Sequence, residues 1–501
     1  MDYRIFYPTS SRDFDPSPGP GQRYRQAFGD LRLSRRYEDL MDRFSTRGTS
    51  VLHQWSDERK EVAAAYRFVS NDRVGLEELI YQSSRIAEEQ IRGKDLQVNL
   101  DRSSFSLKSG GTFRADWVQE VGVLEDNRTA GFYLTPALVL ERHTQHCLGL
   151  GDILLHTRPQ SQLSRQENSR ARAERAKLPL AQKESGAWIL VAAHTARQLE
   201  TARRVTFVID QGGDSYEVFD YVLRQLKQDF LIRVKTDRRA SHRSKACQGR
   251  FSELLADQAW CSVRLVPIRP LNHISKSSGK RVLRQKREAC LAIRFIEVTL
   301  ERPGSWLNPQ ASIDQVLSLI EVREQAQTVP LGEEPIHWLL LTSWKVEQIQ
   351  TAWAAVEAYQ GRWHIEQLFR CSKKQGLNVE SSQLRDPQSI MKLAIMSLKV
   401  SAQALQLTQV RDGQEFVPLE SMFDNKEQEL LEKLNAKLSG KTEKVRNPHQ
   451  PDSLAWAAWV IARLGGWKGY ASQRKPGPIT MMRGVQRFYD LYFWTEVDFS
   501  P

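Results

Sequence analysis

Apolar and polar positions change their spacing several times along the chain, and each spacing predicts a different kind of element. Over residues 31–92, apolar residues recur three or four positions apart among many charged ones, which predicts a small helical domain. Ser56, Asp57 and Glu58 are typical of the start of its middle helix, a capping residue followed by acidic residues. Residues 1–30 are rich in proline, glycine and serine, which predicts a loosely structured lead-in.

Short apolar runs typical of buried strands follow this helical region. They alternate with longer stretches of helical spacing, and this order favours an α/β domain with a mixed sheet, a hairpin first and parallel strands after it. The expected strands are 96–100, 131–140, 147–156, 205–209, 230–235 and 338–342. The expected helices are 184–201, 219–228, 346–375 and 387–406.

Residues 236–337 have a different texture, in which basic clusters alternate with strand-like runs. This segment is predicted to be a β-rich insertion into the α/β domain, which then consists of residues 93–235 and 338–410. The stretch 160–183 is polar and basic and is predicted to be exposed. Residues 411–501 are predicted to form a helical C-terminal region.

Composition narrows the class of protein. A chain of 501 residues with 40% hydrophobic residues is long enough for several cores. Its 72 Lys and Arg exceed its 60 Asp and Glu, a net charge of +12 that suits a polyanionic partner without separating DNA, RNA and a membrane surface. Five scattered cysteines without a CxxC pair argue against a disulfide framework or a zinc site. The apolar runs fall well short of the roughly 20 residues of a membrane span, so a soluble cytoplasmic protein is expected.

Residues 359–375 carry the most informative polar pattern. Four side chains recur at helical intervals within an arc of roughly 60°: Tyr359, Arg362, Glu366 and Lys373. Arg370 joins the same stripe. One carboxylate among cations and a phenol suits a glutamate that holds a metal ion while the cations bind phosphate oxygens. The alternative is a salt-bridged surface helix in which Glu366 and Arg370 form an ordinary pair one turn apart.

Two aspartates end apolar runs. Asp101 and Asp210 each follow a predicted strand, and ligands in α/β sheets lie at the carboxyl ends of strands. Neighbouring carboxylates repel each other unless a divalent cation binds them. Together with Glu366 they could hold two Mg²⁺ ions, one to activate a water or a 3′-hydroxyl and one to stabilise the leaving oxygen at phosphorus. The alternative for each aspartate alone is a turn or cap residue.

Several segments resemble one known family in the same order. The signature Tyr-x2-Arg-x3-Glu-x6-Lys, filled by Tyr359, Arg362, Glu366 and Lys373, is similar to that of the bacterial cut-and-paste DDE transposases of the insertion-sequence-four group, which use a DNA-hairpin intermediate. Four shorter segments share the resemblance, which covers most of the chain: AAYRFVSN (64–71), KESGAW (183–188), WLLLTS (338–343) and IARLGG (461–466).

The resemblance implies a fold and a set of roles. The α/β domain would be RNase H-like and interrupted by the β-rich insertion, with helical N- and C-terminal domains. Asp101, Asp210 and Glu366 would be the catalytic triad and would bind two Mg²⁺ ions, for which Mn²⁺ would substitute. Phosphate near the hairpin end would be bound by the signature cations and phenol, namely Tyr359, Arg362 and Lys373, with Arg370 assisting.

The resemblance also assigns partners. Residues 31–92 would recognise the terminal inverted repeats of an insertion sequence, target DNA would be the second DNA partner, and residues 411–501 would pair two protomers into a homodimer. No membrane partner is expected. Trp338 would stack on a flipped base; its alternative is a core tryptophan at the start of a strand.

The sequence departs from the family beside both aspartates. Asp210 is followed by Gln211, Gly212 and Gly213, where the family often has arginine, and Asp101 is followed by Arg102 in place of a small hydroxyl residue. The two glycines would either let the backbone approach DNA or shape a turn. Two rival functions stay open: a nuclease of the same fold that does not join strands, and a non-catalytic DNA-binding regulator.

Overall fold

The structure is a computed structural model that forms two compact units. One unit consists of Met1–Arg170, Arg197–Arg203 and Trp363–Pro501, and the other of Ala171–Ala196 and Arg204–Arg362. They are called unit 1 and unit 2 below. The structure describes residues 28–107, 115–161, 186–242, 247–268, 271–274, 281–303, 315–373, 376–413, 416–440, 446–470 and 472–496. It also describes four single residues within 162–185.

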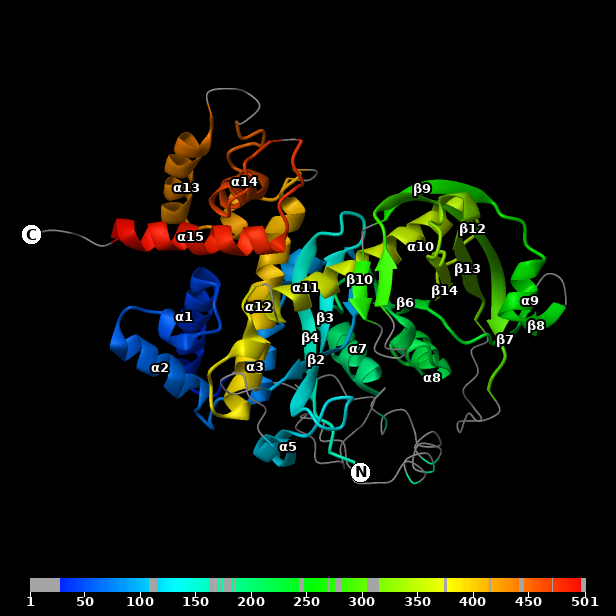
Figure 1. Cartoon of the computed structure of the whole chain (residues 1–501), viewed down its shortest axis with the longest axis horizontal. Helices are drawn as coiled ribbons and strands as arrows, with labels where there is room; N and C mark the ends of the chain where they lie inside the picture. The colour runs from blue at the N-terminus through cyan, green and yellow to red at the C-terminus, as the bar shows by residue number, and fades with distance from the viewer. Residues whose placement is uncertain are drawn as a thin grey trace, which may run out of the picture. The chain divides into compact units, whose positions relative to one another are not determined.

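The strands of unit 1 form an antiparallel arrangement around one long central strand (Figure 1). This strand is β3 (Gly131–Glu141), and it pairs antiparallel with β1 (Asp95–Leu100), β2 (Ser103–Ser106) and β4 (Cys147–His156). All residues of β3 except the last are buried, because apolar side chains fill both faces. The predicted hairpin of β3 and β4 is therefore confirmed.

Four α-helices precede β1 in the described residues. α1 (Leu31–Arg47) begins at Asp30, whose carboxylate accepts the Arg32 N–H, and it ends at Gly48 in the left-handed conformation that glycine adopts easily. The others are α2 (Arg59–Val69), α3 (Leu76–Ser83) and α4 (Glu88–Ile91). The predicted cap at Ser56 is wrong, because its hydroxyl accepts the Glu58 N–H in a turn just before α2 starts.

The helices after residue 362 pack with this N-terminal region. α12 (Pro387–Val410) is buried along most of its length, and Asp386 caps it by accepting the N–H groups of Gln388 and Ser389. One hydrophobic core joins side chains of α1, α2, β3 and β4 to those of α11 and α12. The remaining helices of unit 1 are α5 (Ala115–Val121), α11 (Trp363–Lys373), α13 (Asn425–Leu438), α14 (Leu454–Leu464) and α15 (Pro478–Glu496).

Unit 2 contains a mixed sheet. β5 (Arg204–Ile209) runs parallel to β6 (Asp229–Arg233), and β14 (His337–Thr342) pairs antiparallel with β6. β13 (Leu317–Glu324) and the long β12 (Arg287–Leu300) continue the sheet in antiparallel order. The mixed α/β class predicted from the sequence is confirmed.

The other elements of unit 2 surround this sheet. α10 (Ile349–Gly361) packs on β6 and β12, and its tryptophan and alanine side chains enter the same core as those strands. The further strands are β7 (Arg239–His242), β8 (Cys247–Arg250), β9 (Ser262–Ile268), β10 (Leu271–Ile274) and β11 (Arg281–Arg284). The further helices are α8 (Tyr216–Asp220) and α9 (Phe251–Ala256), while α7 (Ala187–Gln198) spans the division between the units.

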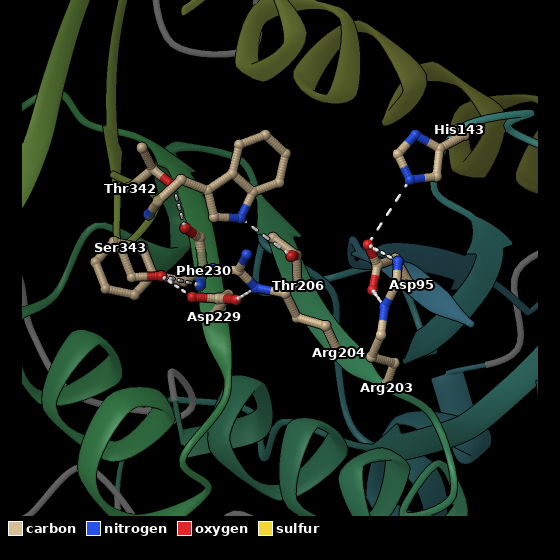
Figure 2. A network of polar contacts seen from close by, with 10 residues as sticks. Asp95, His143, Arg203, Arg204, Thr206, Asp229, Phe230, Thr342 and Ser343 are labelled. Carbon is tan, nitrogen blue, oxygen red and sulfur yellow. Dashed lines mark hydrogen bonds and ion pairs between the residues drawn. The ribbon is translucent and has the colours of Figure 1, made fainter. Parts of the chain in front are cut away.

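Polar contacts fix the starts of the strands that lead to the predicted site (Figure 2). In unit 2, Asp229 at the start of β6 accepts a hydrogen bond of 2.7 Å from the Ser343 hydroxyl and pairs with Arg204 at the start of β5. The Phe230 carbonyl accepts the Thr342 hydroxyl at 2.7 Å. Side chains therefore reinforce the pairing of β5, β6 and β14.

A separate pair fixes the start of β1 in unit 1. Arg203 donates two hydrogen bonds to the Asp95 carboxylate, at 2.8 and 2.7 Å, and His143 lies 3.7 Å from the same group (Figure 2). The hydrogen bonds from Arg203 lower the pKa of Asp95, so this carboxylate stays charged.

The helix predicted over residues 346–375 is wrong as a single element. Two helices, α10 and α11, meet at Arg362. The Arg362 N–H donates to the Tyr359 carbonyl three residues back, which tightens the last turn of α10. Gly361, a weak helix former, stands at this point. Tyr359 and Glu366 are consequently not on one continuous helix face.

Two predicted segments fall wholly or mostly outside the described residues: the lead-in at 1–30 and the exposed stretch at 160–183. None of the described helices combines the length and apolar character that crossing a bilayer requires.

Candidate active site

Asp101 follows the last residue of β1 and is half-buried. Its Oδ1 accepts the N–H of Arg102 at 2.8 Å, which orients the carboxylate. The Arg102 guanidinium lies 5.2 Å from the centroid of the Tyr133 ring, which itself stacks on His156. Arg102 thus packs against an aromatic pair of β3 and β4.

Glu366 lies in the first turn of α11 and is also half-buried. A carboxylate is favourable there because the N-terminus of a helix carries partial positive charge. α11 packs beside β1. Asp101 and Glu366 therefore project from neighbouring elements of unit 1.

Asp210 follows the last residue of β5 in unit 2. Its Oδ1 accepts the Gly212 N–H at 2.7 Å, so the carboxylate caps the short 3-10 turn Gln211–Gly213. A Cβ atom on Gly212 would lie 2.9 Å from this oxygen and 3.0 Å from Cζ2 of Trp188. The glycines form this turn, one of the two roles open for them, and Gly212 leaves room for the aspartate to fold back.

A second acidic residue behind the turn is Asp214, whose side chain is fully buried. Its Oδ2 accepts the N–H groups of Lys235 and Thr236, both at 2.9 Å, and its other oxygen lies 2.7 Å from Arg238. Asp214 therefore joins the loop after β5 to the loop after β6. Sequence analysis missed this role, because its partners follow a different strand.

Tyr359 is the centre of a polar and aromatic group in unit 2. Burial raises its pKa, while the charges of Arg362 and Arg233 act in the opposite direction. Asp210 lies close enough to raise the Tyr359 pKa as well, and the Trp338 ring meets the tyrosine edge-on with centroids 5.7 Å apart. The phenol is consequently protonated at neutral pH and can donate a hydrogen bond.

Four residues predicted for the site are therefore neighbours in unit 2: Asp210, Trp338, Tyr359 and Arg362. Arg233 was not predicted as a site residue. The sequence offered one signal for it, because this arginine ends β6, the strand that pairs with the strand before Asp210. Trp338 is half-buried and packs against the core of unit 2, as its alternative interpretation expected.

Lys373 is mostly buried in unit 1, where an exposed phosphate-binding lysine was expected. Its Nζ donates to the Ser103 hydroxyl at 3.2 Å and to the Ser104 carbonyl, and it lies 3.6 Å from Glu380. Only 18% of the side chain is exposed. Arg370, one turn earlier on α11, is exposed. In this structure, protein groups surround the Lys373 ammonium.

The predicted metal ligands are divided between the units, with Asp101 and Glu366 in unit 1 and Asp210 in unit 2. Within the described part of the chain, no three Asp, Glu, His or Cys side chains form a group that could hold a metal ion. The donor type nevertheless fits, because carboxylate oxygens are the ligands that Mg²⁺ prefers. Backbone N–H groups also hold one oxygen of each aspartate in a fixed direction.

Carboxylates are the oxygen donors that hold divalent metal ions in phosphoryl-transfer enzymes, and arginine side chains suit phosphate oxygens. Comparison with family models agrees with this class. Residues 189–401 match the model described as "Transposase DDE domain", and residues 25–74 match "Transposase DNA-binding". The matches support a DNA transposase with a DNA-binding region and a DDE domain, a type of enzyme that cleaves DNA with a metal and has an RNase H-like fold.

Proposed function

We propose that this protein catalyses cut-and-paste transposition of an insertion sequence and belongs to the insertion-sequence-four group. It nicks the transposon ends, forms and opens a DNA hairpin, and joins the freed ends to target DNA. The signature from Tyr359 to Lys373 carries the proposal, because it lies wholly within the residues that match the DDE domain model. Asp101 lies before that match, and its assignment depends on its place at the end of β1.

Asp101, Asp210 and Glu366 are proposed as the catalytic triad that holds Mg²⁺, with Mn²⁺ as a substitute. Bound metal would activate the attacking oxygen and stabilise the leaving one. The protein's own part is to orient these carboxylates. The N–H groups of Arg102 and Gly212 do this for the two aspartates.

Tyr359, Arg362 and Arg233 are proposed to bind the phosphate next to the hairpin. The arginines present planar forks of N–H donors that suit phosphate oxygens. Burial and the nearby Asp210 keep the Tyr359 phenol protonated as a further donor. Trp338 meets this group edge-on and is proposed to stack on a flipped base.

The remaining assignments concern the partners. Arg370 is exposed and is proposed to contact DNA phosphate directly. Lys373 is proposed to reach phosphate only after it leaves its partners on β2. Residues 31–92 are proposed to bind the terminal inverted repeats, which the match at 25–74 supports, and 411–501 to pair two protomers into a homodimer. The domain limits at 92, 235, 337 and 410 stay predictions.

The test uses Glu366→Gln with Glu357→Gln as the matched control, since Glu357 is an exposed glutamate on α10. Duplexes carry the inverted repeats that flank the gene. Loss of a metal ligand removes several kcal/mol of transition-state stabilisation, so Glu366→Gln should cleave roughly a thousandfold more slowly in Mg²⁺. Binding of the duplex should stay within about twofold for both variants.

Two outcomes would contradict the proposal. Unchanged cleavage by Glu366→Gln would remove Glu366 from the triad, and absence of cleavage by wild-type protein would favour a DNA-binding regulator. A second assay with pre-cut ends separates transposition from hydrolysis, because a nuclease of the same fold would give no joined product.

A further inference from the structure

Glu380 lies in the short turn between α11 and α12 and reaches back to a strand far away in the sequence. It belongs to the 3-10 turn η7 (Val379–Ser381). Its Oε1 accepts both the N–H of Ser106 at 3.0 Å and the Ser106 hydroxyl at 3.1 Å. Only 12% of the side chain is exposed. One buried carboxylate oxygen therefore fixes the last residue of β2.

Lys373 fixes the other end of the same strand. Its Nζ contacts the Ser103 hydroxyl and the Ser104 carbonyl, and it lies 4.9 Å from the centroid of the Phe105 ring. The ammonium also pairs with Glu380 at 3.6 Å. Lysine and glutamate thus hold β2 at both ends and neutralise each other where neither is well solvated.

This tether joins β2, the strand that follows Asp101 in the chain, to α11, the helix that carries Glu366. β2 begins two residues after Asp101 in the chain. Lys373 follows Glu366 by seven residues on α11, about two helical turns. A movement of β2 would therefore shift Asp101 relative to the helix that carries Glu366.

The turn that carries Glu380 is itself anchored. The Ser50 N–H donates to the Leu377 carbonyl at 3.0 Å, and the Ser50 hydroxyl donates to the Asn378 carbonyl at 3.1 Å. Ser50 belongs to the segment that matches the transposase DNA-binding model. The backbone of the turn that carries Glu380 is thus held by two hydrogen bonds from Ser50.

We propose that Glu380 is a positioning residue for the metal-binding carboxylates: through β2 and Lys373 it sets Asp101 relative to Glu366. The role rests on the proposed function, which assigns these two residues as ligands. Glu380 itself needs no contact with metal or DNA. Its removal should weaken metal binding because Asp101 becomes less ordered, while the ligand set stays complete.

The experiment measures Mn²⁺ binding by electron paramagnetic resonance in the DNA-free, full-length protein. Glu380→Ala removes both the acceptor for Ser106 and the charge partner of Lys373, and it should weaken Mn²⁺ binding by roughly tenfold. Glu380→Gln keeps an acceptor oxygen and should lose only about threefold. Ser381→Ala, an exposed neighbour in the same turn, should bind as wild type. Hydrogen exchange of the β2 amides should be faster in Glu380→Ala.

The outcomes distinguish failure of the positioning role of Glu380 from failure of the proposed function. Faster exchange of β2 with unchanged Mn²⁺ binding would show a purely structural contact and would overturn the positioning role, as would unchanged exchange. If Glu380→Ala does not fold, wild-type Mn²⁺ affinity in Glu380→Gln overturns it. Wild-type protein that binds no Mn²⁺ would contradict the proposed function, and the positioning role with it.

Discussion

A single glycine decides where the Asp210 carboxylate points. Gly212 donates its N–H to Asp210, and there is no space between that oxygen and the Trp188 ring for a methyl group. Its backbone does not need a left-handed conformation, so the constraint comes from contact alone. The departure from the family at this turn therefore leaves the aspartate with a defined orientation.

Gly212→Ala should slow DNA cleavage by about tenfold, because the added methyl group displaces the carboxylate or the indole. The free energy of unfolding should fall by only about 1 kcal/mol, since the turn is at the surface. Cleavage rates at saturating Mg²⁺ and urea unfolding measure the two effects. Gln211→Ala, in the same turn but without this close approach, is the control. Wild-type cleavage rates in Gly212→Ala would contradict the claim that close contacts at Gly212 orient the Asp210 carboxylate.

At the residue scale the sequence locates side chains better than their partners. Asp101, Asp210 and Glu366 stand out because acidic residues there interrupt an apolar run or a cationic stripe. The contact between Glu380 and Ser106 joins residues 274 positions apart, and no local pattern encodes such a pairing. Asp214 was missed for the same reason, since its partners follow a different strand.

At the scale of elements, several strands were predictable because apolar residues recur along each of them, in continuous runs or at every second position. β1, β3, β5 and β14 follow their expected bounds to within a residue, since a run of apolar side chains leaves few alternatives. The break between α10 and α11 was not predictable, because the helical spacing of side chains continues across Arg362. The break comes from one backbone hydrogen bond that spans three residues, from the Arg362 N–H to the Tyr359 carbonyl. α13 and α15 lie within residues 411–501, which were predicted to be helical without bounds for these two helices.

Two strands of unit 2 depend on a buried ion network. Arg287 on β12 lies 2.8 Å from the Glu324 carboxylate on β13 and 2.6 Å from Glu333. Burial by itself would raise the pKa of Glu324, whose side chain is fully buried, but the hydrogen bonds from Arg287 and the Ile336 N–H outweigh it and lower the pKa. The network therefore contributes stability only while Glu324 is ionised.

Arg287→Ala should lower the free energy of unfolding at pH 7 by about 3–5 kcal/mol, because it leaves a buried carboxylate without its partner. A carboxyl with a lowered folded-state pKa stabilises above its unfolded pKa and loses that contribution as pH falls through the folded value. The free energy of unfolding of the wild-type protein should therefore decrease below about pH 4, and that of Arg287→Ala should decrease less. Urea unfolding at pH 7 and in acid measures both.

The control is Arg239→Ala, which removes an ion pair with Glu301 at the surface. Exposed pairs contribute between nothing and about 1 kcal/mol, so little change is expected. Equal losses for the two arginines would contradict the assignment of a structural role to the buried network.

At the scale of the whole molecule, the division into two units falls inside the signature. Tyr359 and Arg362 belong to unit 2, whereas Glu366 and Lys373 belong to unit 1. A motif that reads as one helix in sequence therefore spans two independently compact parts of the chain. Sequence spacing grouped these residues into one signature, but it carried no information about this division.

The net charge of +12 gives the whole molecule a measurable property. Binding of lysine and arginine to DNA phosphates releases counterions, so the logarithm of the association constant falls linearly with the logarithm of salt concentration. The slope is about −0.9 for each phosphate contact, and several contacts predict a loss of roughly a thousandfold or more between 50 and 200 mM salt.

Arg370→Gln tests whether one exposed cation contributes to this slope. If Arg370 contacts a phosphate, the slope should become less steep by about one. Because phosphate contacts do not read base sequence, binding of transposon-end DNA and of unrelated DNA should weaken by similar factors. Fluorescence anisotropy at several salt concentrations measures the slope. Arg239→Gln removes the same charge from the surface of unit 2, where Glu301 already pairs with it, and should leave the slope unchanged. An equal change in both variants would mean that net charge, and not a contact at α11, sets the salt dependence.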